Sequence, residues 1–285
     1  ANASVSVTFD GTSLFEGLTY ANGRTLFFPK TVKESSDAQV FSIRVDKDGT
    51  SQLVEFERTE GALWEIQLEL ADQPIEQVPL DVLFLLDATG SMADEINQIK
   101  STLLSISHRI SDLPSQPDLR FGMVTYRDRG DQFITRTYPF ESNIMEFVTS
   151  IQGVVADGGG DEPESLNEAL HVAVNQVDWR LGDAIRLVFL IADAPPHLDY
   201  IEDYDYAEEM VRASQRGIKI FPIASSGLNT QGEYIFRQIA LHTMGKFIFI
   251  LYGGSTSHDV GEYTVENLDD LVVNLVEEEL SHLQR

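Results

Sequence analysis

The sequence predicts an α/β fold: a doubly wound, mostly parallel sheet flanked by helices, preceded by a small all-β, sandwich-like domain. Residues 82–86 form a continuous apolar run, which is typical of a strand buried on both faces of a parallel sheet. After this run, strand and helix patterns alternate, as they do in doubly wound sheets. Before it, short alternating segments are separated by turn residues. We therefore expect a β-rich domain over residues 1–78 and an α/β domain over residues 79–285.

The first 78 residues contain five segments in which apolar and polar side chains alternate, as in half-buried strands. These segments are 5–9, 25–28, 40–45, 51–56 and 63–70. Pairs of turn-forming residues separate them, and Asp48-Gly49 is placed to close a β-hairpin. No set of residues with catalytic chemistry occurs here. We expect a scaffold or spacer, joined to the next domain by residues 71–79.

Beyond residue 79 the hydrophobic pattern alternates between the periods of strands and helices. The predicted strands are 82–86, 119–126, 133–138, 187–192, 218–223 and 247–252. The predicted helices are 96–110, 144–151, 166–177, 203–216, 233–242 and 265–283. The strand at 133–138 follows a tight turn, so we expect it to lie antiparallel at an edge of the sheet.

Composition excludes several classes of partner. The chain has 46 acidic and 20 basic residues and a formal charge of −26, which argues against nucleic acid or an anionic membrane surface as partner. No apolar stretch approaches the ~20 residues of a membrane-spanning helix, so no membrane insertion is expected. Cysteine is absent, which excludes disulfides and thiolate metal ligands and fits a bacterial, secreted protein. We expect an extracellular or cell-surface location, with a cytoplasmic one as the alternative.

Polar side chains alternate directly after the buried strand 82–86. Asp87, Thr89 and Ser91 follow it, and the carboxyl ends of strands are where open α/β sheets bind their ligands. Carboxylate and hydroxyl oxygens are ligands for a hard cation such as Mg²⁺ rather than for zinc or copper. The alternative is purely structural, because Ser91 could cap the helix that follows. These three residues alone do not decide between the two interpretations.

Two later stretches favour the metal site. Residues 158–164 combine three glycines with acids before a helix pattern, and the strand 187–192 ends in Asp193. With these, the chain from about residue 80 resembles the von Willebrand factor A (vWA) family and its metal-ion-dependent adhesion site. The resemblance implies that Asp87, Thr89, Ser91 and Asp193 hold Mg²⁺, or Ca²⁺ or Mn²⁺ in its place. It also implies an open coordination position for an Asp or Glu carboxylate of a protein partner.

The middle loop departs from the commonest family pattern, in which a threonine binds the ion. This sequence has Asp161 and Glu164 there, which is similar to the integrin β-subunit type. The resemblance implies that Glu164 is a direct ligand and that Asp161 serves the same ion or a neighbouring one. Asp94, Glu95 and Asp128 are candidates for additional ions. The alternative for Glu164, Asp94 and Glu95 is a place in a helix's first turn, where the helix dipole favours acids.

The expected function is that of a metal-dependent, adhesion-like protein-binding module and not of an enzyme. One alternative is a metal-assisted hydrolase using the same acids, but no histidine or lysine is placed as its base. Another is an intracellular vWA subunit that couples an ATPase to a client. No zincin, phosphate-loop or nucleophile-elbow motif occurs. The tripeptide at 129–131 matches an integrin-binding motif, and a turn between strands explains its glycine.

Overall fold

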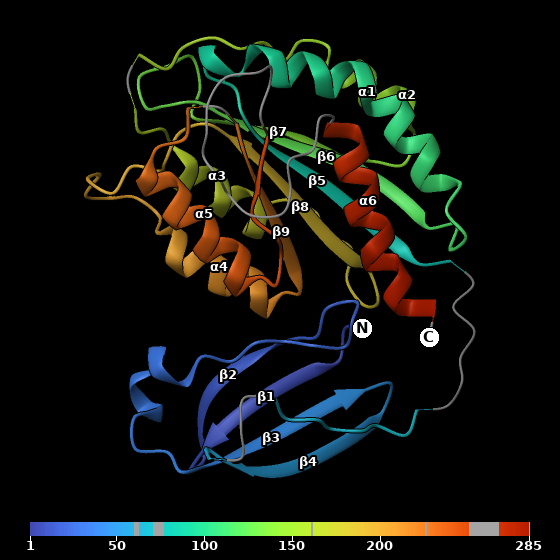
Figure 1. Ribbon diagram of the computed structural model, residues 1–285, viewed down its shortest axis with the longest axis vertical. Coiled ribbons are helices and arrows are strands. Elements are labelled where there is room, and N and C mark those ends of the chain that lie inside the picture. Colours follow the sequence, from blue (N-terminus) through green and yellow to red (C-terminus); the bar gives the residue numbers. More distant parts are fainter. Residues whose placement is uncertain (60–62, 71–76, 161, 226, 251–267, 285) are drawn as a thin grey trace.

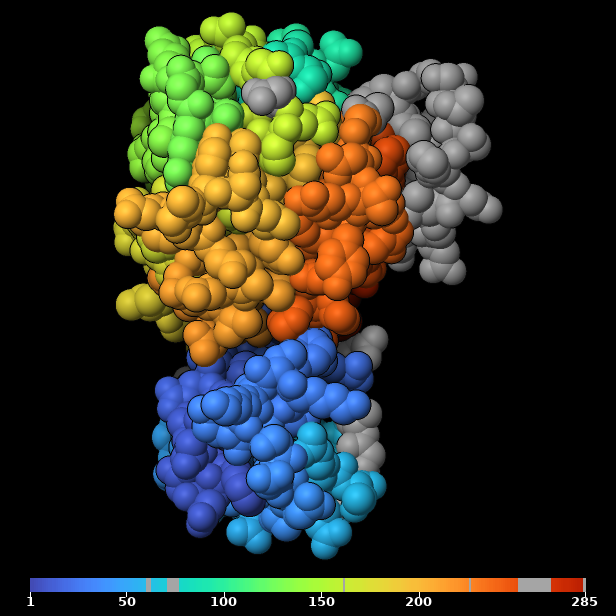
Figure 2. Space-filling model, turned by 90° about the vertical axis from the view of Figure 1, so that its left-hand side faces the viewer, coloured from blue at the N-terminus to red at the C-terminus, as the bar shows by residue number. Residues whose placement is uncertain are grey.

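The structure is a computed structural model that describes residues 1–59, 63–70, 77–160, 162–225, 227–250 and 268–284. It contains two sheets (Figure 1). A six-stranded sheet with helices on both faces forms the larger lobe. A four-stranded antiparallel sheet forms the N-terminal lobe, which Figure 2 shows as a separate body below the larger one. The predicted fold class is therefore confirmed.

The larger sheet has the strand order β10-β9-β8-β5-β6-β7, with β5 near its centre. Its strands are β5 (Pro79–Asp87), β6 (Asp118–Tyr126), β7 (Thr135–Glu141), β8 (Ile185–Ala192), β9 (Ile218–Ala224) and β10 (Ile248–Phe249). All neighbours pair in parallel except β7, which runs antiparallel to β6 at the edge, as predicted. The last strand is shorter than the predicted 247–252, of which residues 251 and 252 lie outside the described residues.

Three helices cover each face of this sheet. One face packs against α1 (Ala93–Ser111), α2 (Ile144–Ile151) and α6 (Leu268–Ser281), and the other against α3 (Leu166–Asn175), α4 (Tyr206–Gln215) and α5 (Thr230–His242). Alternate residues of β5 point into the two cores: Phe84 belongs to one, and Leu83 and Leu85 to the other. Because both faces are covered, β5 has no solvent-facing side, which is why its sequence is a continuous apolar run.

The N-terminal sheet has the order β2-β1-β3-β4, and all its neighbours are antiparallel. Its strands are β1 (Ser4–Phe9), β2 (Thr12–Leu18), β3 (Val40–Lys47) and β4 (Thr50–Glu57). The predicted hairpin at Asp48-Gly49 joins β3 to β4. Both of its residues have positive φ, +49° and +80°, as a two-residue hairpin turn requires.

Two of the predicted N-terminal strands are absent. Residues 25–28 and 63–70 are extended segments without a hydrogen-bonded strand partner among the described residues. Trp64, Ile66 and Leu68 nevertheless pack on the apolar cluster of the sheet. These segments take the place of the second layer that a sandwich would have. An alternating sequence pattern indicates which side chains face the apolar core. It does not indicate whether the backbone forms hydrogen bonds to a neighbouring strand.

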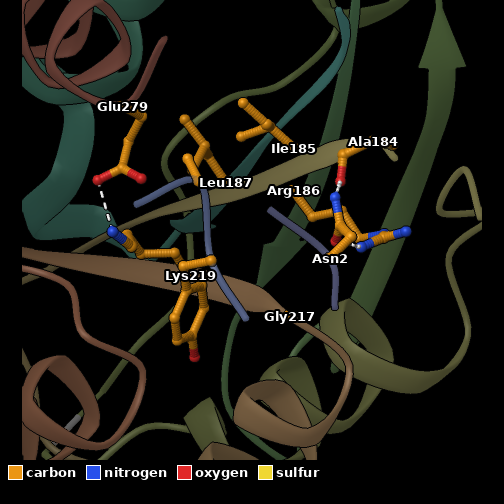
Figure 3. Close-up of a pocket in the computed structure, with 10 residues that line it drawn as sticks. Asn2, Ala184, Ile185, Arg186, Leu187, Gly217, Lys219 and Glu279 are labelled. Carbon is orange, nitrogen blue, oxygen red and sulfur yellow. Dashed lines mark hydrogen bonds and ion pairs between the residues drawn. The ribbon is translucent and has the colours of Figure 1, made fainter. Parts of the chain in front are cut away.

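The two lobes meet at the amino ends of the parallel strands. Asn2 donates through Nδ2 to the carbonyl of Ala184 (3.1 Å), and its Oδ1 accepts from Nη1 of Arg186 (3.1 Å) (Figure 3). Beside them the buried Lys219 Nζ lies 2.5 Å from Glu279 Oε1 and 5.2 Å from the centre of the Tyr20 ring. The carboxyl ends of the strands, where the candidate ligands lie, are therefore at the far end of the larger lobe. Among the described helices, none is both long and apolar enough to cross a membrane.

Candidate metal centre

Asp87 ends β5 with its carboxylate completely buried. Both the backbone N–H and the hydroxyl of Thr89 donate to Asp87 Oδ1, at 2.9 and 2.7 Å. Asp87 Oδ2 is buried and has no hydrogen-bond partner among the described residues. Thr89 thus fixes one oxygen of the carboxylate and leaves the other unsatisfied. A buried oxygen without a donor is a strong acceptor for a proton or a cation.

Glu164 is brought to this place by pairing between two loops. Its backbone N–H donates to the carbonyl of Pro195 (3.0 Å), and its carbonyl accepts from the N–H of His197 (3.1 Å). These bonds join the middle loop to the loop that follows β8. The Glu164 side chain is 3% exposed, and its Oε2 is a second buried oxygen without a partner.

Gly159 shows that Thr89 and Glu164 face the same space. It has φ +66°, and a Cβ there would lie 2.7 Å from Glu164 Oε1 and 2.7 Å from Thr89 Cβ. Only glycine combines that backbone conformation with so close an approach. The glycine-rich loop therefore packs its backbone against both side chains, which explains why glycine is required at this position.

Burial raises the pKa values of Asp87 and Glu164, and neighbouring acids raise them further. Burial raises the pKa of Asp87 to about 7, with smaller contributions from the charges of Asp193 and Glu95, against the two Thr89 hydrogen bonds. Burial also raises the pKa of Glu164 to about 9, and Asp87 is the largest of its charged neighbours. The causes are desolvation first and like charge second. A bound cation would offset both the cost of desolvation and the repulsion between the like charges.

Asp193 and Ser91 complete the described part of the predicted set. Asp193 directly follows β8, is 9% exposed, and adds to the raised pKa values of Asp87 and Glu164. Ser91 is exposed, in the short turn before α1. The alternative role for Ser91 is wrong, because the N-cap of α1 is Met92 and no side chain caps the helix. Asp161 lies outside the described residues.

No three Asp, Glu, His or Cys side chains in the described part of the chain are close enough to hold an ion by themselves. Three described members of the predicted set, Asp87, Glu164 and Asp193, are acids, and they do not come that close together; hydroxyls and water would have to complete a site, and Asp161 lies outside the described residues. The donors are all oxygen, and two buried carboxylate oxygens lack partners. This chemistry fits a hard divalent cation that keeps some of its water ligands.

The further acids predicted as additional ligands differ in their surroundings. Asp94 is exposed in the first turn of α1, whereas Glu95 is buried there, and burial raises its pKa with Asp193 as a smaller contributor. Asp128 is already engaged: it accepts from Ser165 Oγ (3.0 Å) and from Tyr200 OH (3.1 Å). It therefore has hydrogen-bond donors in the positions where an ion would bind.

The charged side chains of the tripeptide at 129–131 contact residues around the glycine loop that contains Gly159. Arg129 lies 2.7 Å from Glu168 Oε1 and 3.2 Å from Asp203 Oδ1. Asp131 Oδ2 accepts from the backbone N–H of Gly159 at 3.0 Å. The tripeptide is therefore built into the structure around the glycine loop, and its charged side chains are turned to partners within the chain.

Sequence reasoning missed Tyr126 and Ser225. The Tyr126 hydroxyl and the Ser225 hydroxyl are both buried without a partner, and Tyr126 pairs in register with Asp87. Burial raises the pKa of Tyr126 well above its usual value, with Asp87 the largest of the charged contributors. Tyr126 is the last residue of the predicted strand 119–126, and Ser225 lies two residues past the predicted strand 218–223. The rule that selected Asp87 and Asp193, a polar residue directly after a predicted strand, selects neither of them.

Comparisons with known proteins give the same fold. Residues 81–250 match the family model described as von Willebrand factor A domain. The chain is 31% identical over 171 residues to the alpha-protein kinase vwkA of Dictyostelium discoideum, covering 59% of this chain and 27% of that protein. It is 32% identical over 113 residues to human von Willebrand factor A domain-containing protein 7, covering 40% of this chain and 12% of that protein.

A solved structure shares the fold at low sequence identity. Proximal thread matrix protein 1 from the mussel byssus, with a zinc-occupied metal-ion-dependent adhesion site, matches with a TM-score of 0.51 and 17% identity. The match covers 72% of this chain and 46% of that one. The chain thus spans less than half of each relative named here. Because the family model matches more than half of the 285 residues, the chain belongs to the von Willebrand factor A domain family.

Proposed function

We propose that this chain is a metal-dependent protein-binding module in which a divalent cation at the carboxyl end of the sheet binds a carboxylate of a partner. The observation that carries the proposal is the pair of buried, partnerless oxygens, Asp87 Oδ2 and Glu164 Oε2. Two unsatisfied acids in one buried place are costly without a counter-charge, and a cation supplies one. A vWA domain is a fold in which such a role is expected.

The residues that would hold the ion are those that the sequence predicts: Asp87, Thr89, Ser91, Asp161, Glu164 and Asp193. Thr89 and Ser91 offer neutral hydroxyl oxygens, so they add no negative charge at the ion. The cation thereby keeps attraction for an anionic partner. Mg²⁺, Ca²⁺ and Mn²⁺ all accept this donor set, and the choice among them is part of the test.

Binding rather than hydrolysis is the role that the surroundings favour. His197 is joined to Glu164 through the backbone, but its ring is engaged: Nδ1 lies 2.7 Å from Asp199 Oδ1 and Nε2 3.3 Å from Asp128 Oδ1. Nδ1 is thereby tied to a carboxylate outside the predicted ligand set, whereas Nε2 makes no hydrogen bond with any of the described residues. The proposal includes no proton transfer.

The test titrates Mg²⁺, Ca²⁺ and Mn²⁺ into the chain by calorimetry. We expect one site, which Asp87→Asn abolishes and the matched control Asp112→Asn, an exposed acid at the other end of α1, preserves. A pull-down in the presence of the ion that binds should retain a partner that EDTA releases, and Thr89→Ala should weaken that retention. Unchanged titration of the Asp87→Asn variant would remove Asp87 as a ligand. Metal-dependent hydrolysis abolished by Glu164→Gln, with the ion still bound, would replace the binding role by a catalytic one.

A further inference from the structure

The N-terminal sheet contains a large cavity on its apolar face. Its volume is about 660 Å³, and its walls are the inner side chains of β1 and β3 and the two covering segments, 23–29 and 63–70. Protein interiors rarely contain voids much larger than a water molecule, whereas ligand sites commonly occupy 300–1,000 Å³. The cavity opens to solvent, so it is a hollow of ligand size with apolar walls and not a closed void.

Two polar atoms of the covering segments are buried without partners. Trp64 Nε1 and Thr25 Oγ1 both line this region and make no hydrogen bond. The Trp64 ring is held by stacking on Phe56, with centroids 5.3 Å apart and planes 10° apart. Both atoms have almost no accessible surface, so a water-sized atom in the cavity does not reach them and they are not contacts for its ligand.

The charge of the cavity is opposite to that of the chain. Among the described residues that line it, Arg24, Lys47 and Arg58 are charged and none is acidic, although the chain has 46 acids against 20 bases. Lys47 is paired with Asp183, and Arg58 donates to the carbonyls of Ser35 and Ala38. Arg24 is exposed, and its side chain has no partner among the described residues. It is the free cation at this site.

We propose that the N-terminal lobe binds an aliphatic carboxylate, a molecule of the fatty-acid class, with its chain in the cavity and its head group at Arg24. The apolar walls take the chain, and the cation takes the anionic end, where pairing at the solvent boundary avoids burying a charge. Sugars and nucleotides fit poorly, because their many polar groups would lack partners on walls of Val, Ile and Phe. The proposal is independent of the metal centre, which lies at the opposite end of the larger lobe.

The test measures binding of sodium decanoate and of uncharged 1-decanol to the full chain after bound lipid has been removed. We expect one site for decanoate. Arg24→Glu should weaken decanoate binding by about tenfold or more and change decanol binding by less than about twofold. Arg44→Glu is the matched control, because it makes the same charge change on β3 at an exposed side chain that pairs with Asp46. It should alter neither ligand.

Two further variants test the walls. Trp64→Phe keeps the ring stacking and removes only an N–H that the cavity does not reach, so it should leave decanoate binding within about twofold. Ile43→Trp places a larger ring in the cavity and should abolish binding of both ligands, with the fold checked by circular dichroism. Absence of decanoate binding to the unaltered chain would overturn the proposal, as would equal effects of Arg24→Glu and Arg44→Glu. Self-association that rises with protein concentration and blocks uptake would identify a second copy as the occupant and would overturn it too.

Discussion

Asp87 and Glu164 come from segments 77 positions apart in the chain (164 minus 87), and each has one buried carboxylate oxygen without a hydrogen-bond partner. Gly159 packs between Glu164 and Thr89, the residue that fixes the other Asp87 oxygen. The protein thus brings two acidic groups together with one oxygen of each buried. This relationship determines how the chain should respond to pH, to metal and to substitution.

The first prediction concerns pH in the absence of metal. The pKa values of Asp87 and Glu164 are raised in the folded chain, to about 7 and about 9, so the native state binds more protons than the unfolded state above pH ~4. The stabilising effect is complete below pH ~4 and is lost as pH rises through 7 and 9. With EDTA present, the free energy of unfolding should fall by several kcal/mol between pH 5 and 9, because each group contributes about 1.4 kcal/mol for every pH unit over which only its native form stays protonated. Urea titrations would measure it, and Asp87→Asn should flatten the profile.

The second prediction concerns metal and stability. An ion that binds the native state alone raises stability with the logarithm of its concentration, by about 2.7 kcal/mol at 100 times Kd. Thermal unfolding at several Mg²⁺, Ca²⁺ or Mn²⁺ concentrations should show this rise at pH 7. It should vanish in Asp87→Asn and persist in Asp112→Asn. A melting temperature that responds neither to EDTA nor to any of the three ions would contradict the proposed site.

The third prediction uses neighbouring glycines as test and control. Gly159→Ala forces a methyl group against Glu164 and Thr89 at a φ of +66°, whereas Gly160→Ala meets nothing within 4 Å and has no such φ. The first should cost about 1–3 kcal/mol of stability and weaken metal binding, and the second should do neither. Urea unfolding and calorimetry measure the two effects. Equal behaviour of the two variants would show that the loop does not pack as described.

The fourth prediction concerns a buried ion pair between β9 and α6 of the larger lobe, beside the contact with the N-terminal lobe. Lys219 and Glu279 form an almost fully buried ion pair, so Glu279→Gln leaves a buried ammonium without its counter-charge and should cost about 3–5 kcal/mol. Glu233→Gln breaks an exposed pair with Arg237 on α5 and should cost less than about 1 kcal/mol. The double variant Lys219→Met with Glu279→Leu should recover most of the loss. Urea unfolding of the three variants distinguishes these outcomes.

Burial determines how much of the fold could be predicted from the sequence. β5 and β8 are covered on both faces, so their apolar runs are unambiguous, and the helices carry clear apolar stripes. Residues 63–70 have the alternation of a strand and cover the N-terminal sheet without joining one. The sequence pattern indicates which side chains are buried. Whether the backbone joins a sheet depends on whether the edge of another strand lies close enough for hydrogen bonds.

The candidate site, too, could be predicted from the sequence only in part. Asp87 and Asp193 were found because they end apolar runs, and Tyr126 and Ser225 were missed because neither directly follows a predicted strand. In the sequence, an aromatic or small residue at the end of a strand is indistinguishable from a residue that only completes the hydrophobic core. Only three-dimensional neighbours reveal that its hydroxyl lacks a partner. The closeness of Glu164 to Asp87 depends on the pairing of the middle loop with the loop after β8, which no local pattern predicts.

The N-terminal sheet is attached at the amino ends of the parallel strands, and this determines how far it lies from the metal loops at their carboxyl ends. β5 has nine residues, so the metal loops lie roughly 30 Å from the contact between the lobes, at about 3.3 Å per residue. A ligand in the N-terminal cavity and a partner at the metal loops would not compete for space. A molecule that carries a ligand for each of these two sites, joined by a tether long enough to span the distance between them, would bind more tightly through effective concentration alone. A tether too short to span that distance would give no such gain.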